Sequence, residues 1–71
     1  MYRWIQTDRA RYYQAILVKD LFGDWAVITA WGSLGSKRGG MRITRVVSYD
    51  AGLERIGEID KRRKQHGYRS V

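Results

Sequence analysis

The chain has no cysteine, no proline and a single histidine, His66, among its 71 residues. Without cysteine the protein has neither disulfides nor thiolate metal ligands, and one histidine cannot complete a His/Cys metal site. The sequence also offers no Ser-His-Asp or Cys-His arrangement for nucleophilic catalysis. His66 stands among cations near a predicted helix end, a position typical of a solvated residue. We therefore expect no enzyme activity, no small-molecule substrate, no metal and no cofactor.

Long apolar runs are also missing. No segment approaches the roughly 20 apolar residues that span a bilayer, and Met1–Gln6 lacks the apolar core of a secretion signal. We expect a cytoplasmic protein without a membrane partner. No repeat or low-complexity segment marks a boundary, so we expect a single domain over residues 1–71. Its core should cover about residues 11–69, with residues 1–10 as a lead-in of uncertain structure.

Acidic residues are few: seven Asp and Glu stand against fourteen Lys and Arg, which gives a formal net charge of +7. Nine of the fourteen cations fall between Lys37 and Lys64, and arginine outnumbers lysine ten to four. The planar guanidinium suits bidentate contacts to phosphates and base edges, and it stacks on aromatic rings. This pattern favours nucleic acid as a partner, although the same balance also suits an anionic membrane, an acidic protein or a basic protein that binds none of them.

Three segments rich in β-branched and aromatic residues predict strands, and one long segment after them predicts a helix. The predicted strands are Arg11–Lys19, Trp25–Trp31 and Met41–Val47, with a short edge strand at Tyr2–Ile5 and a last one within Tyr68–Val71. The predicted helix is Tyr49–His66, capped by Ser48 or Asp50 and ended by Gly67 in the left-handed conformation. These elements predict an α+β fold: a small twisted antiparallel sheet of three to five strands with one helix packed on one face.

The helix should depend on the sheet for its stability. Gly52 and Gly57 each cost roughly 1 kcal/mol relative to alanine, and the apolar stripe of Tyr49, Leu53 and Ile56 is narrow. The basic run at residues 61–64 suits the negative end of the helix dipole as well as it suits DNA, so both roles remain open.

The second predicted strand has one small-residue face, with Ala26 and Ala30, and one aromatic face, with Trp25 and Trp31. We expect the helix over the alanine face because small residues allow a close approach, although the reverse assignment remains open. The aromatic face would then need the N-terminal segment, a partner or a ligand to cover it. Trp25 is also interpretable as a plain core residue.

A tryptophan-glycine pair closes this strand and opens a glycine-rich basic loop. The informative segments are Leu21-Phe22-Gly23-Asp24-Trp25, Trp31-Gly32-Ser33-Leu34-Gly35, the paired glycines Gly39-Gly40, and the basic helix end before Gly67-Tyr68. Their order resembles a WGR domain, a family named for a Trp-Gly-Arg signature. The resemblance covers residues 12–68 and is nearest to the bacterial branch. WGR domains are known from DNA-damage-activated poly(ADP-ribose) polymerases and from small bacterial proteins.

The resemblance implies a WGR-like fold and a DNA-binding module. In the polymerase members the signature tryptophan packs on DNA near a strand end, and the same role is implied for Trp31. The signature arginine of those members contributes DNA and interdomain contacts. This chain has Ser33 at that position, so the arginine's role does not carry over.

The residues favour DNA binding independently of the resemblance. The loop glycines allow backbone amides to approach phosphates, and Lys37 and Arg38 add charge beside them. Arg42 and Arg45 should project from opposite faces of the third strand, with Arg42 nearer the loop. The predicted DNA-contacting residues are Trp31, Gly32, Gly35, Lys37, Arg38 and Arg42, with Arg62 and Arg63 as additional phosphate candidates.

We therefore expect a non-catalytic DNA-binding module that contacts mainly backbone phosphates, with an aromatic ring at the loop mouth. Such contacts imply little sequence specificity and an accessory or regulatory role. The alternative is a protein-interaction module that dimerises, or docks on a catalytic partner, through an exposed aromatic face of the sheet.

Overall fold

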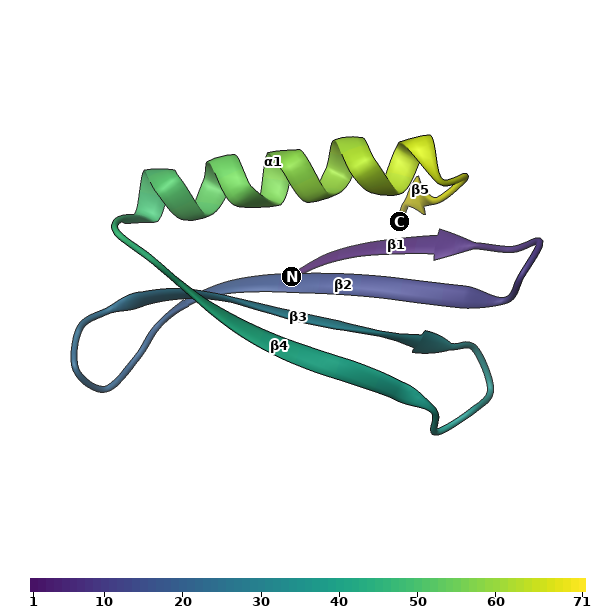
Figure 1. The fold of residues 1–71 in the computed structure, drawn as a ribbon, viewed down its shortest axis with the longest axis horizontal. Coiled ribbons are helices and arrows are strands. Elements are labelled where there is room, and N and C mark those ends of the chain that lie inside the picture. The colour runs from purple at the N-terminus through teal and green to yellow at the C-terminus, as the bar shows by residue number, and fades with distance from the viewer.

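The chain folds into one antiparallel sheet with a helix on one of its faces. A computed structural model describes residues 1–71. Its elements are β1 (Tyr2–Gln6), β2 (Arg11–Lys19), β3 (Trp25–Ser33), β4 (Gly39–Val46), α1 (Tyr49–Gln65) and β5 (Arg69–Ser70). The five strands lie in the order β4-β3-β2-β1-β5, and α1 runs along one face of the sheet (Figure 1). The predicted α+β class, with a single helix on an antiparallel sheet, is confirmed.

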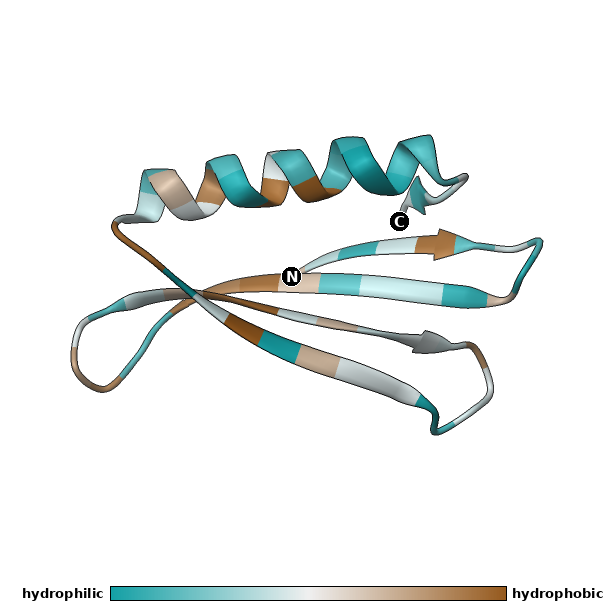
Figure 2. Cartoon of the chain, viewed as in Figure 1, coloured by the Kyte–Doolittle hydropathy of each residue, from teal (hydrophilic) through white to brown (hydrophobic).

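The helix covers the aromatic face of the sheet, opposite to the face that we predicted. On this side Trp25 of β3 meets Tyr49 of α1 edge-on, with 5.2 Å between ring centroids. The expected position above Ala26 is wrong because the small residue that lets the layers approach lies on the helix. A Cβ atom at Gly52 would come within 3.0 Å of Cδ2 of Leu17. Figure 2 shows the apolar positions of α1 turned toward the sheet and its polar positions turned away.

The face without a helix is therefore mainly aliphatic, with Tyr12 as an aromatic member. Ile16, Ile28 and Ile43 are cross-strand neighbours on this face, one from each of β2, β3 and β4. The exposed aromatic face that the protein-interaction alternative requires lies instead on the side that α1 occupies. α1 covers part of this face, and Tyr13 and Trp31 remain accessible beside the helix.

The N-terminal ten residues include a strand inside the sheet, because β1 lies between β2 and β5 rather than at an edge. Trp4 on this strand is only 2% exposed and belongs to the core cluster with Val27 and Ile56. Its indole Nε1 donates a hydrogen bond to Asp60 Oδ1 at 2.8 Å. This bond, followed by one from Lys64, holds the pKa of Asp60 below its usual 3.8, so the acceptor is ionised at neutral pH. The lead-in thus supplies the largest core side chain.

β3 is longer, and the β3–β4 connection shorter, than the sequence predicts. Gly32 and Ser33 belong to β3, and Gly39 and Gly40 belong to β4, which leaves residues 34–38 as the connection. Gly32 pairs with Gly39, and a Cβ atom at Gly39 would collide with the carbonyl oxygen of Trp31. The paired glycines therefore let the two strands continue where the sequence pattern predicts an open loop.

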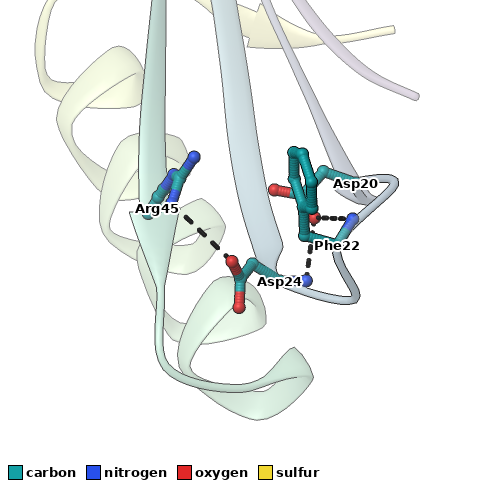
Figure 3. Close-up of polar contacts among 4 residues, drawn as sticks. All are labelled: Asp20, Phe22, Asp24 and Arg45. Atoms are coloured by element: carbon teal, nitrogen blue, oxygen red, sulfur yellow. Dashed lines mark hydrogen bonds and ion pairs between the residues drawn. The ribbon is translucent and has the colours of Figure 1, made fainter.

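The turn between β2 and β3 is closed by backbone hydrogen bonds between Asp20 and Asp24 and between Gly23 and Asp20, and the Asp20 carboxylate adds two more. Oδ1 of Asp20 accepts hydrogen bonds from the backbone N–H groups of Phe22 and Asp24, both at 2.9 Å (Figure 3). Gly23 has a φ of 83°, a conformation that residues with a side chain rarely adopt. This turn lies at one end of the sheet, and the β1–β2 and β3–β4 connections lie at the other (Figure 1).

The ends of α1 follow from its capping residues. Ser48 is the N-terminal cap, since its Oγ accepts a hydrogen bond from the backbone N–H of Ala51 at 3.0 Å. Asp50 lies instead in the first turn. His66 caps the other end, and Gly67 follows it with a φ of 84°, as predicted. The chain then turns back to place β5 beside β1.

Candidate nucleic-acid interface

A groove of about 550 Å³ lies between α1 and the end of the sheet that carries the β3–β4 connection. The C-terminal half of α1 and this connection lie at the same end of the molecule (Figure 1). Residues of β2, β3, β4, the connection, α1 and the segment after α1 line the groove. Elements distant in the sequence therefore meet around one concave surface.

The groove is lined by arginines from four separate segments and by no acidic residue. The arginines are Arg11 on β2, Arg38 in the β3–β4 connection, Arg42 on β4, and Arg55 and Arg63 on α1. A concave surface lined by charges of one sign concentrates the field and attracts ligands of the opposite sign. The arrangement suits a ligand that carries several negative charges.

Aromatic rings make up part of the groove wall. The half-buried ring of Trp31 lies nearly parallel to the ring of Tyr13, with 6.0 Å between centroids and 14° between planes. Trp31 also lies over Gly40, where a Cβ atom would come 2.6 Å from Cζ2 of the indole. Gly40 thus makes room for the tryptophan. The ring contributes both to packing and to the groove surface.

Arg63 is held in place by two of these aromatic side chains. Its guanidinium carbon lies 4.5 Å from the ring centroid of Tyr13 and 5.2 Å from that of Tyr68. Its Nε is buried and has no hydrogen-bond partner in the protein. Stacking fixes the plane of a guanidinium while leaving its N–H donors free for an anion. Arg63 is therefore an oriented donor for an anionic group in the groove.

The structure brings together most of the residues that the sequence singled out. Trp31, Gly32, Arg38, Arg42 and Arg63 line the groove, whereas Gly35, Lys37 and Arg62 do not. Lys37 and Gly35 are exposed within the β3–β4 connection, and Arg62 is exposed on α1. The absence of a side chain at Gly32 allows the backbone of Arg38 to approach, rather than a phosphate, because a Cβ atom there would lie 2.5 Å from the carbonyl oxygen of Arg38.

Arg42 and Arg45 project from opposite faces of β4, as predicted. Arg42 pairs with Thr29 and lines the groove, whereas Arg45 pairs with Ala26 on the helix-free face. Arg45 lies 3.6 Å from Asp24, and both side chains are largely exposed (Figure 3). A solvated pair of this kind contributes little to stability.

Sequence reasoning missed several residues of the groove. Arg11, Tyr13, Arg55 and Tyr68 all line it. A signal for the helical members was present, because Arg55, Ile59 and Arg63 recur at every fourth residue and so share one face of a helix. Arg11 and Tyr13 alternate on β2 and so share one face of that strand. Their meeting with α1 follows only from the tertiary arrangement.

The structure has neither a cluster of metal-ligating side chains nor a membrane-spanning helix. Nowhere do three or more His, Cys, Asp or Glu side chains gather in a way that would hold a metal ion. The helix is too short and too polar to cross a membrane. The groove itself is lined by arginines and aromatic rings.

The fold and the groove together define a small α+β module with an arginine-lined groove. The sequence pattern of the WGR domain family matches residues 2–71, and the chain belongs to the WGR domain family. The WGR domain is a non-catalytic module, and membership in this family suggests nucleic-acid binding. The match includes β1, which the resemblance over residues 12–68 leaves out. No curated protein and no solved structure matches the chain.

Proposed function

We propose that the protein binds DNA in the groove between α1 and the β3–β4 end of the sheet. The observation that carries this proposal is the convergence of five arginines, with no acidic residue, on one groove. Phosphate contacts dominate the affinity of most DNA-binding surfaces, and arginine is well suited to make them. Membership in the WGR family supports the same partner.

The groove residues take distinct roles in this proposal. Arg38, Arg42 and Arg63 bind backbone phosphates, and the groove side of Trp31 packs on a sugar or base. Lys37, beside the groove on the exposed connection, adds a long-range attraction that salt screens. Contacts of this kind position DNA without reading its sequence, so specificity is low. A module without catalytic groups then acts in an accessory or regulatory role.

Arg11 of β2 lies next to the position where the family signature has arginine. Ser33 stands where the family signature has arginine, and Arg11 is its cross-strand partner on β2. Arg11 lines the groove together with Ser33. A guanidinium is therefore still present at this point, supplied by a neighbouring strand, and we propose that it contributes a phosphate contact.

The test is a fluorescence-anisotropy titration of labelled blunt, nicked and single-stranded DNA at about 50 and 200 mM salt. Three to five phosphate contacts predict a log–log slope of affinity against salt of about −3 to −4.5 on duplex DNA. A protein-interaction surface would show much weaker salt dependence. If micromolar protein does not bind DNA detectably at about 50 mM salt, the proposal is wrong.

A further inference from the structure

One edge of the sheet is long and open. β4 is the end strand and runs over eight residues, whereas the opposite edge, β5, has two. Met41 and Ile43 on β4 are 66% and 59% exposed, more than any other apolar side chain within a strand. An end strand presents unpaired backbone N–H and C=O groups, and natural proteins usually shorten, cover or interrupt such edges. Here the chain contains no proline and β4 is uncovered.

The pairing between β3 and β4 fixes which backbone groups point outward. The N–H of Ser33 donates to the carbonyl of Arg38 at 3.4 Å. Antiparallel ladders alternate between residues that exchange hydrogen bonds and residues that do not. Residues 40, 42, 44 and 46 therefore bond to β3, and Met41, Ile43 and Arg45 direct their N–H and C=O groups away from the sheet.

The aliphatic row on the helix-free face ends at this same edge. Ile16, Ile28 and Ile43 are cross-strand neighbours, and Ile43 is more exposed than Ile16, which is 38% exposed. Cross-strand pairs of β-branched residues stabilise a sheet by covering one another. Ile43 lacks such a neighbour on its outer side, where the next strand of the sheet would lie.

We infer that β4 pairs antiparallel with β4 of a second copy, about a two-fold axis at Ile43. In this register Ile43 faces Ile43 of the second copy, which joins the two aliphatic rows. Met41 faces Arg45, and Arg42 faces Thr44. The three outward-pointing residues of each copy then exchange backbone hydrogen bonds, and the two sheets become one.

A second copy fits the edge because the sequence of β4 is compatible with itself in this register. No arginine faces an arginine, since Arg42 lies opposite Thr44 and Arg45 lies opposite Met41. Registers centred on Arg42 or Arg45 would instead place like charges directly opposite each other, which destabilises a sheet. A two-fold axis also makes the contact closed and isologous, so assembly stops at the dimer.

The pairing has a consequence that rests on the proposed function. A two-fold axis perpendicular to the sheet keeps both helices, and both grooves, on the same face of the joined sheet. Arg42 and Thr44 line each groove on the strand next to the junction, so the two grooves adjoin there and extend toward opposite ends of the joined sheet. One DNA segment can then contact both copies, and linked contacts raise affinity without any new type of contact.

The experiment is sedimentation velocity of the full chain without DNA, from low to high micromolar concentration. We expect a species of twice the 8.3 kDa monomer mass. Its fraction should rise with added salt, because screening reduces repulsion between two chains of charge +7. Ile43→Pro removes the outward N–H at the centre of the pairing and should leave only monomer. Ile43→Val keeps this amide and should keep the dimer.

Further variants separate the alternatives. Ile43→Lys, which places two ammonium groups opposite each other, should also give monomer and serves if the proline variant does not fold. Ile16→Lys alters the same face two strands from the edge and should leave the dimer intact. Loss of the dimer in Ile16→Lys together with its retention in Ile43→Pro would show face-to-face packing and overturn the edge pairing. A monomeric wild type at every concentration and salt would also overturn it, leaving the edge to a strand from another protein.

The dimer proposal and the DNA-binding proposal can be refuted independently. Sedimentation uses no DNA, so a dimer that binds no DNA would refute the proposed function and leave the edge pairing standing. Conversely, the Ile43→Pro monomer should still bind DNA through its single groove, with lower affinity than the wild type. The difference in affinity measures what the second copy contributes.

Discussion

Arginines of identical chemistry have different surroundings in this molecule, and those surroundings decide what each can do. Arg63 is stacked on two tyrosines and has a buried, unpartnered Nε, so its rotamers are already restricted before any ligand arrives. Arg45 is exposed and lies near Asp24, and it keeps its hydration. A pre-positioned cation loses less conformational entropy on binding than a mobile one. Net charge alone therefore does not identify the binding residues.

The two arginines of β4 provide a matched test. Arg42→Gln should weaken duplex binding by about 1 kcal/mol, roughly fivefold, because a charge-assisted phosphate contact is lost. Its salt slope should become shallower by about 0.9. Arg45→Gln, on the same strand but the opposite face, should change both quantities much less. The measurement is anisotropy at two salt concentrations, and equal effects of the two substitutions would place DNA outside the groove.

At the scale of elements, the two glycines of α1 have different structural roles, although helix propensity treats them alike. Gly52 is buried where the helix meets β2, and a Cβ atom there would collide with Cδ1 of Leu17. Gly57 is exposed, and a Cβ atom there would meet nothing within 4 Å. The first glycine therefore sets the distance between the layers, whereas the second only weakens the helix.

This difference predicts stability changes of opposite sign. Gly57→Ala should raise the free energy of unfolding by up to about 1 kcal/mol through helix propensity alone. Gly52→Ala gains the same propensity but adds an overpacking cost of about 1–3 kcal/mol at Leu17, so it should lower stability. Urea unfolding followed by circular dichroism measures both. A stabilising Gly52→Ala would mean that Leu17 swings aside and that the layers do not need the glycine.

At the scale of the whole molecule, local patterns predicted the elements and the packing of one helix on an antiparallel sheet, but not which face of the sheet the helix covers. β-branched runs, turn residues and the Ser48 and Gly67 signals were enough to place the helix and the three longest strands. The face that α1 covers depends on Gly52 meeting Leu17, a contact between residues far apart in the sequence. The groove has the same origin, since Arg11 and Arg55 belong to different elements. β1 gave a weak signal because it has five residues and is interrupted by polar side chains.

The strand with this weak sequence signal, β1, carries Trp4, the side chain on which we expect the fold to depend most. Trp4 is almost fully buried, and it joins β1 to α1 through the hydrogen bond to Asp60. A chain of this size has a total stability of about 4–10 kcal/mol. Trp4→Ala should remove about 3–5 kcal/mol of it, because a large cavity forms in a small core. The variant should therefore be partly or wholly unfolded at room temperature.

Two substitutions show whether this loss is specific to Trp4. Trp25→Ala removes an equally large ring from a half-buried site beside Tyr49, and it should cost less because less apolar surface is lost from the core. Trp4→Phe keeps most of the ring but removes the N–H donor, and it should cost an intermediate amount. Thermal and urea unfolding rank the three variants. Were Trp4→Ala as stable as the wild type, β1 would be an appendage rather than part of the sheet, and the core would have to lie entirely within residues 11–69.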